Sequence, residues 1–163
     1  MQQELHKNPH YGRASVEHAP SVAEAIQEAQ ATEILDYGAG KGRLGEELKR
    51  LLPTPIVVHQ YDPAIPKWSK SPAPCQFVAC IDVLEHIEPH LIDNVLDHLQ
   101  ALTIKNGFFT IHTGPAKKKL SDGRNAHLIQ KPMEWWIPMF SSRFQILKTT
   151  EMPNGFYIFV KAL

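Results

Sequence analysis

Three glycines at alternate positions, placed directly after a short apolar segment, constrain this chain more than any other feature. Residues 33–37 (EILDY) have the composition of a buried strand, and residues 38–42 (GAGKG) follow at once. Glycine adopts positive φ without strain and lets a ligand approach the main chain, so a tight turn from a strand into a helix is expected here. In open α/β sheets, ligands bind beyond the carboxyl ends of such strands.

Strand and helix patterns alternate along the chain and end in a hairpin. Expected strands cover residues 33–37, 56–61, 77–83 and 108–113, while residues 144–150 and 156–162 flank a Pro-Asn-Gly turn. Strands separated by helices form parallel sheets, whereas hairpin strands are antiparallel. The sequence therefore predicts an α/β fold with a doubly wound, mostly parallel sheet and a C-terminal antiparallel hairpin.

Two helix boundaries are predicted from local signals. Residues 21–24 (SVAE) form a capping box, so a helix is expected to begin at Ser21. The polar residues 1–20 before it are interpreted as an N-terminal arm or lid. The pair Asn106 and Gly107 is expected to end the helix that precedes the fourth strand.

Length and charge limit the function classes. The 163 residues suit one domain that spans residues 1–163, and 17 basic residues balance 17 acidic ones. A neutral chain offers no broad basic face, which argues against holding nucleic acid mainly through its phosphates. Cys75 and Cys80 form no Cys-x-x-Cys pair, and no apolar run approaches the ~20 residues that cross a bilayer. We therefore expect a cytoplasmic protein without a membrane segment.

The glycine turn also fits a different ligand. Residues 40–45 match the dinucleotide-binding pattern G-x-G-x-x-G, and Asp62 falls about 20 residues later, where an acid would bind a ribose. However, Asp36 lies just before the turn, where a carboxylate would repel a pyrophosphate and would suit a cationic amino-acid ligand. Together with the terminal hairpin, Asp36 disfavours a dehydrogenase.

With these motifs, residues 11–163 resemble the class I S-adenosylmethionine-dependent methyltransferases, which have a Rossmann-like fold. Their first motif is an apolar strand, an acid and Gly-x-Gly-x-Gly, as in residues 34–42, and residues 78–86 resemble their fourth motif. The resemblance implies S-adenosylmethionine as the cofactor, with Asp62 at its ribose. The cofactor-binding residues that it implies are Tyr11, Asp36, Tyr37, Gly38, Ala39, Gly40, Asp62, Pro63, Ile81 and Asp82.

A closer resemblance lies downstream. Residues 61–66, 82–89, 114–116 and 122–128 resemble a group of small methyltransferases often carried by bacteriophages and bacteria, which implies no particular substrate. Full domains of the wider family have a further strand and helix between the ribose acid and the fourth motif. Only 20 residues separate Asp62 from Asp82, so we expect a sheet abbreviated at this place. The adenine would then be held by the backbone of residues 63–65 or by Trp68.

Methyl transfer requires a nucleophile aligned with the sulfonium methyl and, where that nucleophile carries a proton, a base. His127 is our first candidate, since imidazole titrates near neutrality. It lies in residues 114–140, which by resemblance form the acceptor side. Glu85 and His86 are the second candidates, because they would share one face with Asp82 if a helix began there.

These residues leave alternatives open. Small-RNA 3′-terminal methyltransferases hold a divalent metal with a similar Glu-x-x-Glu-His and a later histidine. Here His112 or His127 would have to complete such a set, and we assign no metal. The favoured function is methylation of an oxygen or nitrogen nucleophile on a small molecule. An RNA or nucleotide methyltransferase and a non-catalytic S-adenosylmethionine-binding module are its rivals.

Overall fold

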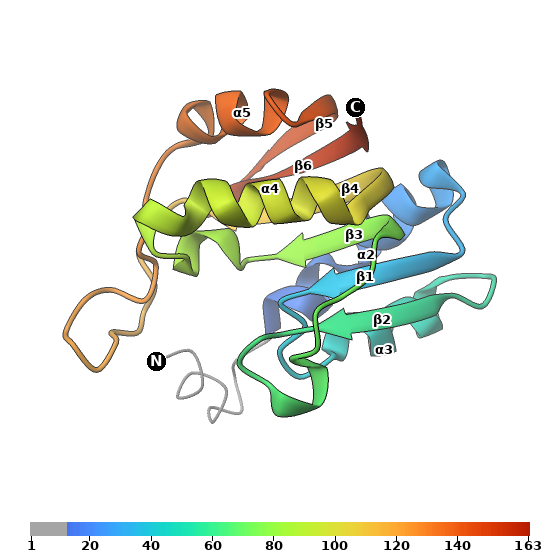
Figure 1. Cartoon of the computed structure of the whole chain (residues 1–163), viewed down its shortest axis with the longest axis horizontal. Coiled ribbons are helices and arrows are strands. Elements are labelled where there is room, and N and C mark those ends of the chain that lie inside the picture. Colours follow the sequence, from blue (N-terminus) through green and yellow to red (C-terminus); the bar gives the residue numbers. More distant parts are fainter. Residues whose placement is uncertain (1–12) are drawn as a thin grey trace.

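The computed structural model of the chain describes residues 13–163, which build a six-stranded sheet (Figure 1). Its strands are β1 (Glu33–Tyr37), β2 (Val57–Tyr61), β3 (Cys75–Ile81), β4 (Thr103–His112), β5 (Phe144–Met152) and β6 (Gly155–Ala162). The strand order is β2-β1-β3-β4-β6-β5; β1 to β4 pair in parallel, and β6 pairs antiparallel with β4 and β5. The predicted mostly parallel sheet with a C-terminal antiparallel hairpin is confirmed.

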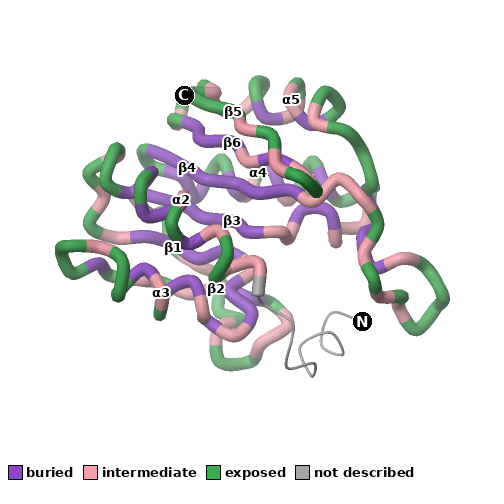
Figure 2. Tube along the Cα trace, turned by 180° about the vertical axis from the view of Figure 1, so that it is seen from behind, coloured by how far each residue is buried: buried purple, intermediate pink, exposed green. Residues whose placement is uncertain are grey.

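Helices cover both faces of the sheet. α4 (Ile92–Leu102) and α5 (Met133–Ser141) lie on one face, and α2 (Arg13–Ala29) and α3 (Arg43–Leu51) lie on the other (Figure 1). None of the helices in the described residues is long and apolar enough to cross a membrane. Neighbouring residues of β1 pack into opposite cores, Leu35 with α4 and Ile34 with α2 and α3. β1 and β3 are therefore largely buried (Figure 2).

The first described helix begins before the capping box. α2 starts at Arg13 rather than at Ser21, and Pro20 lies inside it. An interior proline removes a helical hydrogen bond and costs roughly 3 kcal/mol. Ala19 and Val22 are fully buried in one core with residues of α3, and this packing outweighs the cost of the proline. Residues 13–20, expected to be an arm or lid outside the core, are therefore part of a helix that reaches the core, while Tyr11 lies outside the described residues.

The helix before β4 also ends earlier than predicted. α4 ends at Leu102, and β4 runs through Asn106 and Gly107. The Asn106 side chain donates a hydrogen bond to the carbonyl of Val160 on β6 at 3.0 Å. A Cβ atom at Gly107 would lie 2.7 Å from the ring of Phe109, so glycine is needed there because the ring covers the backbone. Close packing, and not a helix end, explains this Asn-Gly pair.

The segment between β2 and β3 is short, as predicted. Its regular structure is one 3₁₀ turn, η1 (Pro66–Trp68), with no strand or α-helix between Asp62 and Pro74. Consequently β2 forms an edge of the sheet, and its Val57 and His59 side chains are exposed.

Candidate active site

A cavity of about 690 Å³ opens at the carboxyl ends of β1, β3 and β4. The glycine turn after β1 and residues 81–83 after β3 line it. His86, His112 and His127 also line it, together with residues 113–118. Ala14 and Ser15 of α2 also line this cavity, so part of the segment expected to be an arm or lid forms its wall.

The glycine turn is shaped by backbone conformations that favour glycine. Gly38, Gly40 and Gly42 have φ angles of 81°, 53° and 74°. The amides of Gly38 and Ala39 donate hydrogen bonds to the carbonyl of Tyr61, at 2.8 and 3.0 Å. A Cβ atom at Gly38 would lie 2.4 Å from a methyl carbon of Val83, so no larger residue fits between the turn and the segment after β3.

Asp62 fixes the turn from the neighbouring strand. Its buried carboxylate accepts hydrogen bonds from the amides of Gly40 and Ala64, both at 2.9 Å. Neither Asp62 nor the exposed Pro63 lines the cavity, so Asp62 supports the turn from behind. A ribose contact by Asp62 would have to use the remaining acceptor capacity of its two oxygens.

Asp36 is a buried carboxylate with an unmatched oxygen. It is 3% exposed, and its Oδ2 atom has no hydrogen-bond partner. Burial, reinforced by the charge of Asp62, raises the pKa of Asp36 to about 7. Asp36 and Tyr37 do not line the cavity, although Gly38 beside them does. The Tyr37 hydroxyl instead contacts Nδ1 of His98 at 3.0 Å on the α4 side.

Replacing Asp36 by asparagine should stabilise the ligand-free protein increasingly between about pH 4 and pH 8. Because the pKa of Asp36 is raised from 3.8 to about 7, its contribution to stability is fully present below pH 3.8 and is lost as the pH rises through about 7. The difference corresponds to about 4 kcal/mol. Urea unfolding at several pH values measures it, with the exposed Glu24→Gln as control; a pH-independent effect of Asp36→Asn would contradict the raised pKa.

Asp82 lines the cavity as an anion. Its backbone has a φ of 51°, and its amide donates to the Thr110 hydroxyl at 2.9 Å. The Thr110 hydroxyl donates in turn to Asp82 Oδ1, and His18 Nε2 lies 3.8 Å from Oδ2. Burial acts to raise the pKa of Asp82, but the nearby His18 and the hydrogen bond from Thr110 outweigh it, so the pKa is lowered. Asp82 therefore presents a negative charge beside Ile81, which also lines the cavity.

Three histidines gather at the far end of the cavity. Nδ1 of His86 donates to the carbonyl of Ala126, and Nδ1 of His127 donates to the carbonyl of Gly114, both at 2.7 Å. The ring of His127 lies 4.7 Å, centroid to centroid, from the rings of both His86 and His112. Burial, followed by the nearby His127, lowers the pKa of His86 to about 4, and burial also lowers the pKa of His127. Both rings are therefore neutral at pH 7, with Nε2 unprotonated.

Glu85 lies behind these histidines. Its side chain is fully buried; Oε1 accepts the amide of His112 at 3.2 Å, and Oε2 has no hydrogen-bond partner. Burial and the charge of Asp82 raise the pKa of Glu85 well above its usual range. The expected shared helix face of Asp82, Glu85 and His86 is wrong. Asp82 has positive φ and residues 84–86 form a 3₁₀ turn, which directs Asp82 and His86 to the cavity and buries Glu85.

The segment expected to form the acceptor side is divided between two roles. Residues 114–118 and 126–127 line the cavity, whereas Trp136 of α5 is fully buried in the core. Arg124 points elsewhere, since its guanidinium donates to both carboxylate oxygens of Glu88, each at 2.9 Å. Sequence patterns do not single out His18, because it lies in the segment interpreted as an arm.

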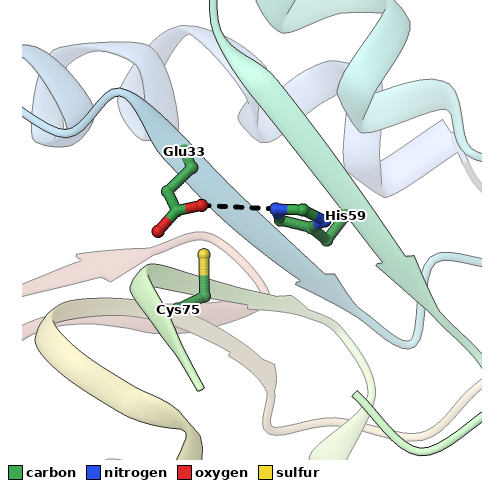
Figure 3. A group of neighbouring side chains, drawn as sticks. All are labelled: Glu33, His59 and Cys75. Atoms are coloured by element: carbon green, nitrogen blue, oxygen red, sulfur yellow. Dashed lines mark hydrogen bonds and ion pairs between the residues drawn. The ribbon is translucent and has the colours of Figure 1, made fainter. Parts of the chain in front are cut away.

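A second cluster of potential metal ligands lies near the amino ends of β1 and β3 (Figure 3). Glu33 and the exposed His59 form an ion pair at 3.3 Å, and the sulfur of Cys75 points toward them from the next strand. Burial raises the pKa of the Cys75 thiol, which disfavours the thiolate that binds metals. The cluster is separate from the cavity, because none of its residues lines it.

The model of a methyltransferase domain family matches residues 10–149 of the chain. The chain belongs to this family. No curated protein matches the sequence significantly. The matched residues include the glycine turn, the segment after β3 and the three histidines. All residues that line the cavity lie within the match, except Pro153 and Asn154 of the hairpin turn.

Solved structures share the fold of this methyltransferase. A 1,6-didemethyltoxoflavin-N1-methyltransferase of Burkholderia thailandensis, with 1,6-didemethyltoxoflavin and S-adenosylhomocysteine bound, is 16% identical, with a TM-score of 0.67 over 93% of this chain and 79% of that chain. A mitomycin 7-O-methyltransferase is 10% identical, with a TM-score of 0.71 over 93% and 55%. The magnesium protoporphyrin IX methyltransferase of Synechocystis PCC 6803, with S-adenosylmethionine bound, is 13% identical, with a TM-score of 0.64 over 90% and 79%. The chain thus spans between 55% and 79% of the length of these proteins.

Proposed function

We propose that this methyltransferase moves a methyl group from S-adenosylmethionine to an oxygen or nitrogen atom of a small molecule. The observation that carries the proposal is one cavity that is lined by the glycine turn, by the Asp82 anion and by two neutral imidazoles. Two structures of the same fold contain S-adenosylmethionine or its demethylated product, and the three described above are named for small-molecule acceptors.

The residues around the glycine turn suit a cofactor with a cationic amino-acid end. Gly38 leaves the backbone open to the cavity, and the Asp82 carboxylate suits an ammonium group. The Asp36 oxygen without a hydrogen-bond partner adds a second acceptor next to the turn. The ribose would lie toward Asp62. For the adenine, the ring of Trp68 is close by, since a Cβ atom at Gly42 would lie 2.9 Å from its Cη2 atom.

When bound, S-adenosylmethionine supplies an electrophilic methyl group, so the protein mainly has to align the acceptor and exclude water. The carbon–sulfur bond breaks while the new carbon–oxygen or carbon–nitrogen bond forms, and S-adenosylhomocysteine leaves. Nε2 of His127 is positioned to accept the proton that the acceptor loses, because its Nδ1–H is already held by Gly114. His86 packs against His127, and burial keeps the His127 ring neutral.

A nucleotide acceptor is favoured by one observation, the presence of Lys117 and Lys118 at the cavity. The salt dependence of acceptor binding distinguishes a nucleotide from a small molecule without phosphate, because phosphate contacts weaken steeply as the salt concentration rises. The balance of 17 basic and 17 acidic residues supports the small molecule. The free thiols of Cys75 and Cys80 support a reducing compartment such as the cytoplasm.

Calorimetry with S-adenosylmethionine, S-adenosylhomocysteine and NAD tests the cofactor assignment. We expect one S-adenosyl ligand to bind per chain and NAD not to bind. Mass spectrometry of a panel of phenols, amines and nucleotides incubated with isotope-labelled S-adenosylmethionine then tests the acceptor. Binding of NAD in place of S-adenosylmethionine would refute the proposal, and cofactor binding without any methylated product would favour a non-catalytic module.

A further inference from the structure

We propose that Glu85, His86 and His127 form a binding site for one divalent transition-metal ion at the acceptor end of the cavity. One carboxylate oxygen of Glu85 and one ring nitrogen from each histidine lie within 4.8 Å of one another. Sequence separation does not place them together, since His127 is 41 residues beyond His86. The loop that returns along the cavity carries His127 to the 3₁₀ turn that holds Glu85 and His86.

Both imidazoles are held by a hydrogen bond on one ring nitrogen, as histidines that bind metals are. Each Nδ1–H donates to a backbone carbonyl, Ala126 for His86 and Gly114 for His127, at 2.7 Å. This second hydrogen bond fixes the tautomer and the ring direction, as is usual for histidines that bind metals. The atom that each ring has left for a ligand is Nε2, which carries a lone pair.

Glu85 supplies the third ligand and an independent indication of a missing partner. Its side chain is fully buried, and one oxygen accepts the amide of His112. The other oxygen, Oε2, is buried without any hydrogen-bond partner. A buried carboxyl oxygen left without a partner is costly, and a bound cation next to two imidazoles would satisfy it.

The donor set determines the class of ion. Two imidazole nitrogens and one carboxylate favour Mn²⁺, Fe²⁺, Co²⁺, Ni²⁺ or Zn²⁺ over Ca²⁺ and Mg²⁺, which prefer oxygen ligands. Three protein ligands leave further coordination positions open. His86 and His127 line the cavity, so these positions face the acceptor. On the basis of the proposed function, the ion would bind an acceptor oxygen and lower its pKa, with the released proton passing to water.

Titration of the metal-free full chain with Co²⁺ tests the site, followed by visible absorption and by calorimetry. We expect one Co²⁺ per chain with a spectrum of nitrogen and oxygen ligands. Glu85→Gln and His86→Ala should each weaken Co²⁺ binding at least tenfold, because each removes a ligand. His59→Ala is the matched control, since it removes a histidine of the second cluster (Figure 3) and should leave this binding unchanged.

Co²⁺ binding that is unchanged in Glu85→Gln and His86→Ala would overturn the proposal. Loss of Co²⁺ binding in His59→Ala, or a thiolate absorption band from Cys75, would place the ion at the second cluster and would also overturn it. Circular dichroism checks that the variants fold; if the buried Glu85→Gln does not, His86→Ala alone decides. Calorimetry with S-adenosylmethionine on the metal-free protein is independent of these results. Failure of the metal site therefore leaves the cofactor assignment intact, and the reverse also holds.

Discussion

Replacing His127 by alanine is expected to lower kcat at least a hundredfold and to change the Kd of S-adenosylmethionine by less than about threefold. Nε2 of His127 is the unprotonated nitrogen that the cavity offers to an acceptor, whereas the cofactor would lie at the glycine turn. Single-turnover kinetics measure the first quantity and calorimetry the second. The loss applies whether Nε2 takes the proton directly or holds a metal ion that acidifies the acceptor.

The control for this experiment is His90→Ala, which removes an exposed histidine that does not line the cavity and should leave both constants unchanged. The pH profile adds a second readout. Because burial lowers the pKa of His127, the acid limb of the wild-type rate should lie below the usual histidine value of about 6.5. Collapse of cofactor binding in His127→Ala, with Gly114 displaced, would instead identify His127 as a structural residue of the loop.

Replacing Asp62 by alanine is expected to raise the Kd of S-adenosylmethionine at least tenfold. Two causes act together: the loss of charge-assisted hydrogen bonds to the ribose, and the loss of the two bonds that hold the amides of Gly40 and Ala64. Calorimetry measures the affinity, and thermal unfolding measures how far the turn is destabilised.

Asp62→Asn separates the two causes, since it keeps the shape of the side chain and removes the charge. Its amide group can accept from one backbone N–H but presents a donor to the other, so a smaller loss of stability than in Asp62→Ala is expected. Glu24→Gln again serves as the exposed control. An unaltered Kd in Asp62→Ala would refute the cofactor position that we derive from the end of β2.

Much of the fold is predictable because it depends on local patterns. Residues 33–37 form β1 with the predicted bounds, and the Pro-Asn-Gly turn joins β5 to β6. The short segment after Asp62 simply lacks the residues for another strand and helix. The same local rules fail at Pro20, which lies inside α2, and at Asn106, which lies inside β4. At both places, contacts with residues distant in the sequence outweigh the local signal for a helix boundary.

The candidate site was predictable only in part, for a comparable reason. Asp82 and His127 are singled out by motif and chemistry, and both line the cavity. His18 carries no such signal, and its contact with Asp82 requires α2 to pack across the sheet. Tyr37 is adjacent to the turn in sequence, but strand alternation turns its side chain away into the α4 core.

The sequence by itself determined where the chain must turn tightly and in what order strands and helices follow, because glycine, proline and apolar spacing act over a few residues. Only the tertiary structure decided which ionisable groups share an environment. Glu85 is fully buried beside His86 and His127, and Asp36 is buried beside Asp62. The fold brings together residues that are 26 to 42 positions apart in the sequence, and their burial sets their protonation states. No local sequence pattern encodes such contacts.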